Sequence, residues 1–168
     1  CRGRRASRHA PSRPPASRAW PRLRPGSVHA DVVVVPAAWA VAERTVASGA
    51  EFLAAVALGT DIVCRLGKAA RKNTGWFYTS LAGVYGAAAA CAKLLQLGPE
   101  GIADALGLAL SHTGGTQQAL LEKTVAKRLQ SAFAARAGVF SAQLAGTGAS
   151  EDHHGTVKVR HSLALFRI

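Results

Sequence analysis

A chain of 168 residues is long enough for one domain with a hydrophobic core. Hydrophobic residues make up 49% of it but aromatic residues only 6%, which favours closely packed helices over a β-sandwich. The net charge of +12 is concentrated in residues 1–28, which contain eight arginines and no acidic residue. The rest of the chain therefore lacks the basic excess typical of a nucleic-acid-binding domain.

Residues 1–27 consist mainly of Arg, Pro, Ser and Ala and show neither a helical nor a strand period. Such a segment cannot bury enough apolar surface to order itself, so we predict a disordered tail. Two interpretations remain open. The tail is inert or wrongly translated, or it binds nucleic acid or an acidic surface. The chain begins with Cys1 and contains no Met, so we do not expect Cys1 to be a native start.

From Val32 onward the pattern predicts helices joined by short turns marked by glycine. We place Pro36 in a first helical turn, where no amide donor is needed, and expect the helix to continue over 37–47. A break at Ser48-Gly49 precedes a second helix at 51–72, whose basic end complements the helix dipole. Thr79 or Ser80 could cap the next helix.

That next helix, at 80–97, is the most informative part of the chain. Gly83, Gly86 and four consecutive alanines leave little side chain to hold neighbouring helices apart. The segment therefore suits the tight centre of a helical bundle.

Two more helices follow. The first starts at Pro99, carries one buried stripe and stops at Gly114-Gly115. After an ambiguous stretch at 116–126, the second covers 127–145, and its apolar set is Leu129, Phe133, Val139, Phe140 and Leu144. The overall prediction is an all-α helical bundle at 28–147, followed at 148–168 by an irregular tail with one possible short strand.

Several patterns that could carry chemistry are weak. Cys64 and Cys91 lie in apolar helical stretches and are interpreted as small core residues rather than disulfide partners. His153-His154 follows two acidic residues and could bind a metal, but adjacent histidines in a tail seldom do. We therefore expect no metal and no cofactor. No segment is long and apolar enough to span a membrane, and we expect a cytoplasmic protein.

Two sites remain as candidates for chemistry, and one further histidine is interpreted as structural. His29 precedes the first helix, where an imidazole could act as general acid or base. Lys127 and Arg128 begin a helix, where two cations oppose the helix dipole, so holding an anionic substrate is one explanation and a solvated turn is the other. His112 ends an apolar helix and is interpreted as structural.

Read together in chain order, these segments resemble the MmgE/PrpD family, which includes 2-methylcitrate dehydratase and cis-aconitate decarboxylase. The resemblance is carried by the block S-V-H-A-D-V-V-V-V-P-A-A-W-A-V-A-E at 27–43 and by A-E-F-L-A-A-V-A-L-G-T-D-I at 50–62. It continues through T-S-L-A-G-V-Y-G-A-A-A-A-C-A-K-L-L-Q-L-G at 79–98 and A-D-A-L-G-L-A-L-S-H-T-G-G at 103–115, and ends with V-A-K-R-L-Q-S-A-F-A-A-R-A-G-V at 125–139. Each block is weak alone, but the ordered set is specific.

The resemblance implies part of an all-helical domain and cofactor-free lyase chemistry on small di- or tricarboxylates. It implies that His29 is an acid/base residue and that Lys127 binds a substrate carboxylate. Arg128 and Gln130 belong to the same motif and are predicted to bind substrate. The resemblance also implies a homodimer and a small-molecule carboxylate as partner, while binding to a membrane or to nucleic acid is not expected.

The chain also departs from the family pattern. No aspartate-rich motif precedes His29, and Ala30 replaces the usual proline. Phe77 and Gln130 stand where many members have histidine, and Ala132 replaces a glycine. We therefore expect a truncated lyase with little or no activity. The alternative is a non-enzymatic helical module whose basic tail binds nucleic acid or acidic surfaces, and a helical metal-binding protein is a more distant one.

Overall fold

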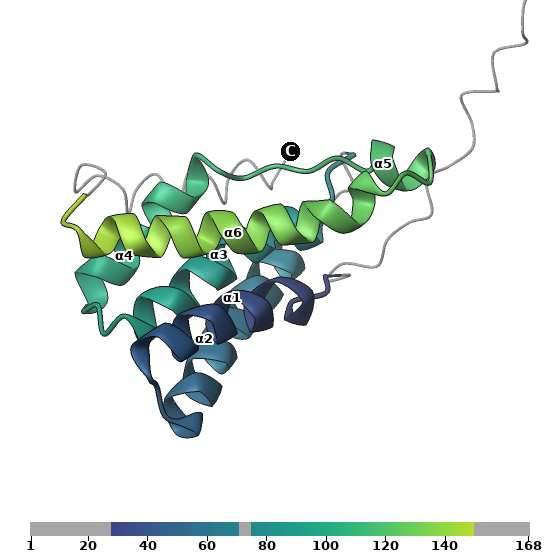
Figure 1. Cartoon of the computed structure of the whole chain (residues 1–168). Coiled ribbons are helices and arrows are strands. Elements are labelled where there is room, and N and C mark those ends of the chain that lie inside the picture. Colours follow the sequence, from purple (N-terminus) through teal and green to yellow (C-terminus); the bar gives the residue numbers. More distant parts are fainter. Residues whose placement is uncertain (1–27, 71–74, 150–168) are drawn as a thin grey trace, which may run out of the picture.

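The structure, a computed structural model, describes residues 28–70 and 75–149 (Figure 1). Within these residues the predicted all-α helical bundle is confirmed, and the only strand-like pairing is an antiparallel bridge between Trp76 and Thr116. The helices are α1 (Asp31–Thr45), α2 (Gly49–Ala69), α3 (Tyr78–Leu94), α4 (Pro99–Leu110), α5 (Gln118–Leu121) and α6 (Ala126–Gly146).

Helix α3 is the centre of the bundle and packs against α1, α2, α4 and α6. In Figure 1 it lies between α6 on one side and α1 and α2 on the other. Every residue from Ala82 to Ala92 is buried, so the helix is enclosed on all sides. A helix that is apolar all round belongs in a core, and the predicted central role of this segment follows from that burial.

Glycines let the neighbouring backbones approach α3 closely. A Cβ added at Gly59 of α2 would lie 2.5 Å from the carbonyl oxygen of Gly86, and one added at Gly86 would lie 2.6 Å from the carbonyl oxygen of Gly59. On the opposite side, a Cβ at Gly138 of α6 would collide with Ala87 and lie 2.8 Å from the amide nitrogen of Ala88. Each added Cβ would lie within 3 Å of a backbone atom, so no side-chain rotation could relieve the clash.

Helix α1 begins earlier than the sequence indicated. It starts at Asp31, so Pro36 lies inside the helix rather than in its first turn. Asp31 stabilises the start because its charge faces the positive end of the helix dipole. Pro36 is exposed, and its ring is tolerated on the outer surface of the helix.

The ends of α2 and α3 also differ from the prediction. Ser48 lies in the predicted break between the first two helices, but α2 starts at Gly49 rather than at residue 51. Ser48 caps α2: its Oγ accepts the N–H of Glu51, whose carboxylate accepts the N–H of Ser48 in return. These hydrogen bonds hold the pKa of Glu51 below its usual value. Phe77 occupies the N-cap position of α3 with no side-chain cap, so neither Thr79 nor Ser80 caps this helix.

The large apolar residues of α6 do not form its buried face. Phe133 and Phe140 remain 58% and 50% exposed, and Leu129 is 46% exposed. The residues that α6 buries are small: Ala134, Ala135, Gly138, Ser141, Ala142 and Ala145. The surface of α3 accepts only small partners at this distance, so packing rather than side-chain size selects the inner face.

The two described cysteines differ in environment. Cys91 is buried in α3, and burial raises the pKa of its thiol to about 12 because the thiolate would be poorly solvated. The core position predicted for Cys64 is wrong, since this residue lies on the exposed side of α2.

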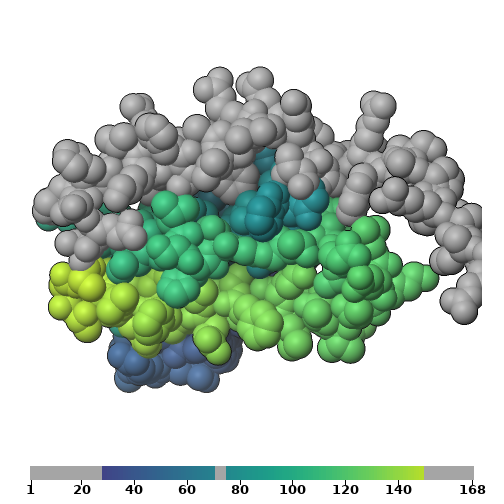
Figure 2. All heavy atoms as spheres, turned by 90° about the horizontal axis from the view of Figure 1, so that it is seen from above, coloured from purple at the N-terminus to yellow at the C-terminus, as the bar shows by residue number. Residues whose placement is uncertain are grey.

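A connection between α4 and α5 runs alongside α6. Figures 1 and 2 both show this segment, residues 111–117, lying next to that helix. The ring of His112 contacts Phe140 edge to face at 5.7 Å, and at the other end Gln130 donates from Nε2 to the carbonyl oxygen of Thr116 at 3.0 Å. The four-residue helix α5 occupies part of the stretch that the sequence left ambiguous.

Three sequence predictions fall on residues that the structure does not describe. These are the basic tail at 1–27, most of the C-terminal tail at 148–168 and the His153-His154 pair. None of the described helices has the length and hydropathy needed to cross a bilayer.

The close approach at Gly138 can be tested by adding one methyl group. We expect Gly138→Ala to lower the free energy of unfolding by about 1–3 kcal/mol, because the new Cβ meets α3 backbone. Gly146→Ala in the same helix is the matched control, because its Cβ would meet only Leu97 Cδ2, at 3.8 Å. Urea denaturation followed by circular dichroism measures both. Equal effects from the two variants would contradict the close-packing explanation.

Candidate functional site

A groove of about 580 Å³ runs between α1 and α6. The two helices start at the same end of the bundle and run in the same direction (Figure 1). From α1 and the segment just before it the groove is lined by His29, Val32, Pro36, Ala37 and Ala40, and from α3 and its N-cap by Phe77 and Thr79. From α6 it is lined by Lys127, Arg128, Ser131, Ala132, Ala135, Arg136 and Val139. We call this feature the α1–α6 groove.

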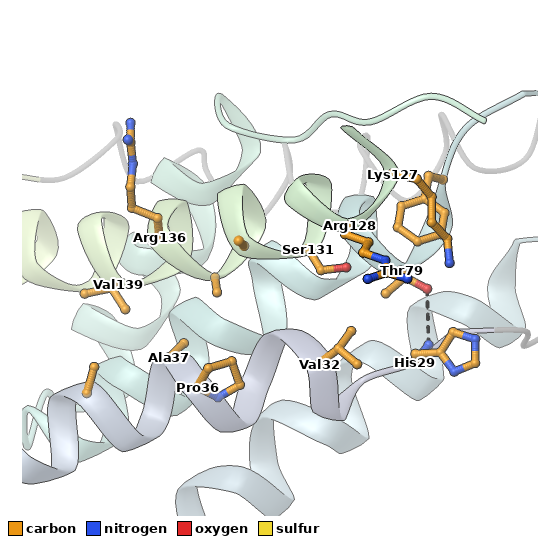
Figure 3. A pocket seen from close by; sticks show the side chains of 14 residues that line it. His29, Val32, Pro36, Ala37, Thr79, Lys127, Arg128, Ser131, Arg136 and Val139 are labelled. Atoms are coloured by element: carbon orange, nitrogen blue, oxygen red, sulfur yellow. Dashed lines mark hydrogen bonds between the residues drawn. The ribbon is translucent and has the colours of Figure 1, made fainter. Parts of the chain in front are cut away.

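One end of the α1–α6 groove is cationic. His29, Lys127 and Arg128 lie there around Thr79, as Figure 3 shows. The structure thus brings together three of the four residues proposed from the sequence, although His29 is about a hundred positions from the two cations in the chain. All three side chains are exposed and can reach a bound ligand.

Thr79 fixes the position of His29. The backbone N–H of His29 donates to Thr79 Oγ1 at 3.2 Å, the interaction drawn as a dashed line in Figure 3. Thr79 lies in the first turn of α3 and is only 2% exposed, so it is held rigidly. The central helix therefore sets where the segment carrying His29 enters α1.

The charges of the α1–α6 groove are of one sign. None of the described residues that line it is Asp or Glu, while Lys127, Arg128 and Arg136 are cations. The first turn of α6 adds the positive end of its helix dipole next to Lys127 and Arg128. No described acidic group pairs with either side chain within salt-bridge distance. The end of the groove near His29 therefore favours a carboxylate or another anion.

Gln130 is placed differently from the other three residues. Its side chain does not line the groove but donates to the carbonyl oxygen of Thr116. Its backbone carbonyl oxygen accepts a hydrogen bond from Ser80 Oγ at 3.2 Å. Gly115, with φ +111°, lies against the same side chain, where a Cβ would be 2.9 Å from Gln130 Oε1. In this structure Gln130 ties α6 to α3 and to the connection before α5. Its predicted contact with substrate stays a prediction.

Sequence reasoning missed Thr79, Ser131 and Arg136 as groove residues. Ser131 and Arg136 could have been found by helical spacing, because Ser131 follows Arg128 by three residues and Lys127 by four, and Arg136 follows Arg128 by eight, which is about two helical turns. Thr79 could not, since its role depends on the packing of α3 against the start of α1. In Figure 3 the guanidinium of Arg136 extends away from α1.

A profile of the MmgE/PrpD N-terminal domain matches residues 23–154, which is most of the chain. The chain belongs to the MmgE/PrpD family. It is 39% identical over 132 residues to the cis-aconitate decarboxylase-like protein oryM of Aspergillus oryzae. It is 34% identical over 131 residues to the cis-aconitate decarboxylase of Aspergillus terreus.

These alignments cover 72% of this chain but only 27% and 26% of the two relatives. The chain thus spans about a quarter of the length of the curated relatives that it matches. The family and the all-α fold that the sequence predicts are confirmed.

Within the described residues no three His, Cys, Asp or Glu side chains gather in a way that could hold a metal ion.

Replacing Gln130 separates its structural role from a role in binding. We expect Gln130→Ala to lower the free energy of unfolding by about 0.5–1.5 kcal/mol, the usual contribution of one hydrogen bond, because Thr116 loses its donor. The affinity of the groove for a small carboxylate probe, measured by calorimetry, should stay within about twofold of the unaltered chain. A tenfold loss of affinity with unchanged stability would instead support the substrate-binding role predicted from the sequence.

Proposed function

We propose that the α1–α6 groove is part of the substrate site of a lyase acting on a small di- or tricarboxylate. The single observation that supports this most strongly is the convergence of His29, Lys127 and Arg128 at one end of the groove. The names of the two Aspergillus relatives point to cis-aconitate as the first substrate to test.

In this proposal Lys127 and Arg128 hold the carboxylates. Arg128 can form two parallel hydrogen bonds to one carboxylate, and Lys127 supplies a compact charge to another. Both act more strongly as negative charge grows on the substrate, because fixed cations stabilise an enolate-like state more than the ground state.

His29 is proposed as the acid/base residue. If the reaction is a dehydration, the imidazole accepts the proton next to a carboxylate while hydroxide leaves the neighbouring carbon. If it is a decarboxylation, carbon dioxide leaves, the electron pair stays on carbon, and the imidazolium returns a proton to it. Thr79 keeps the backbone of His29 in place in either case.

Turnover by this chain alone is expected to be slow. The groove provides one imidazole among its described lining residues, and active-site groups that work together lose far more than one group's share when some are missing. The homodimer implied by the family resemblance is likewise a proposal. The nucleic-acid alternative depends on residues 1–27, which lie outside the described part of the chain.

Charge removal at the cationic end tests the binding proposal. We expect Lys127→Gln and Arg128→Gln each to raise the dissociation constant for cis-aconitate about tenfold, equivalent to about 1.4 kcal/mol. The affinity of the unaltered chain should fall with rising salt, because exposed charges are screened. Calorimetric titration at two salt concentrations measures both effects.

Lys93→Gln is the matched control, since Lys93 is an exposed lysine at the end of α3 and does not line the groove. It should leave the dissociation constant unchanged. If the control weakens binding as much as Lys127→Gln does, the attraction is a general effect of net charge and the proposed site is wrong.

A further inference from the structure

Ser131 places a neutral hydroxyl group next to the cations of the α1–α6 groove. It follows Arg128 by three residues and Lys127 by four, so the three side chains share one face of α6. Ser131 is half-buried and lines the groove, and Figure 3 shows its oxygen on the side of Arg128 and Thr79. The cationic end is therefore continued along α6 by a polar group without charge.

The hydroxyl of Ser131 has no hydrogen-bond partner among the described residues. A serine or threonine inside a helix can donate to the carbonyl four residues earlier. Ser141 of the same helix does so to Ala137 at 2.9 Å, and Thr45 of α1 does so to Val41, also at 2.9 Å. Ser131 does not, and its oxygen stays accessible from the groove rather than enclosed. Its donor is therefore available to a ligand.

A carboxylate held by Arg128 has room for this donor. An ionised carboxylate offers about four lone-pair positions on its two oxygens, and a bidentate guanidinium occupies about two of them. A neighbouring hydroxyl can use a third position without adding charge. Thr79 also carries a hydroxyl in the groove, but it is only 2% exposed and already accepts the N–H of His29. Ser131 is thus the accessible hydroxyl among the described lining residues.

We propose that Ser131 is a substrate-binding residue whose hydroxyl donates to the same carboxylate that Arg128 holds, while Lys127 holds a different carboxylate of the ligand. This inference rests on the proposed carboxylate site and adds a residue to it. The two carboxylates then meet different sets of partners. Ser131 therefore helps to decide which way round a di- or tricarboxylate lies along α6.

The first test removes the hydroxyl from the full 168-residue chain. We expect Ser131→Ala to raise the dissociation constant for cis-aconitate about tenfold in calorimetric titration, because a hydrogen bond to a charged group is lost. Alanine is favourable in a helix, so the urea midpoint should not fall. Ser131→Thr keeps a hydroxyl and should bind more tightly than Ser131→Ala. Ser111→Ala, at the exposed C-cap of α4 and outside the groove lining, is the matched control and should bind like the unaltered chain.

A second test asks which carboxylate Ser131 contacts. If Ser131 and Arg128 share one carboxylate, the affinity losses of Ser131→Ala and Arg128→Gln should combine to less than their product in the double variant. The losses of Ser131→Ala and Lys127→Gln should multiply, because these residues hold different carboxylates. Multiplying losses in both pairs would overturn the shared contact with Arg128.

The outcomes separate this inference from the proposed function. If Ser131→Ala binds as tightly as the unaltered chain while Lys127→Gln weakens binding, the carboxylate site stands and the role of Ser131 is wrong. If Ser131→Thr binds as weakly as Ser131→Ala, or if Ser111→Ala weakens binding equally, the hydroxyl of Ser131 is not the group responsible and the inference is overturned. If the unaltered chain does not bind cis-aconitate at all, both proposals fail.

Discussion

The close approach of backbones around α3 is the constraint on which the rest of the structure depends. Gly59 meets Gly86 on one side, and Gly138 meets Ala87 and Ala88 on the other. At these contact points only glycine fits, and the surrounding positions hold mainly small residues, so the core contains few large side chains and its fully buried large residues are mainly valines. Stability then depends on dense packing of many small groups rather than on a few large ones, since dispersion contacts are weak singly and add up. The same constraint turns Phe133 and Phe140 of α6 outward.

This packing also assembles the site. Because α1 and α6 both pack on α3 and start at the same end, His29 and the Lys127–Arg128 pair lie at the mouth of one groove. Thr79 completes the arrangement, since it belongs to the first turn of the central helix and accepts the N–H of His29. The helix dipole of α6 is unfavourable for two cations in its first turn. That local cost has a functional explanation if these cations meet a carboxylate.

The positions of Phe77, Gln130 and Ala132 in the fold explain what these departures from the family pattern do. Phe77 and Ala132 both line the α1–α6 groove, where the family resemblance implies a histidine and a glycine. Phe77 makes the wall of the groove more apolar than a histidine would. Gln130, also at a position where several members have histidine, holds the connection at Thr116 and so supports α6 from the side away from α1. The departures from the family pattern at these three positions therefore divide into two that shape the groove and one that stabilises its wall.

The sequence by itself determined the helical class, the central place of the small-residue helix and the family, because small residues at helical spacing and ordered motifs are local patterns. It also pointed to His29, Lys127 and Arg128 through motif resemblance. Only the tertiary structure decided which face of α6 is buried, because side-chain size suggested Phe133 and Phe140 while the narrow distance to α3 admitted Gly138 and its alanine neighbours. Two further contacts were also decided by the tertiary structure. Thr79 and His29 lie 50 positions apart in the chain, and the hydrogen bond from Gln130 to Thr116 joins α6 to the connection before α5. No local pattern encodes them, since they exist only once α3 has brought the surrounding segments together.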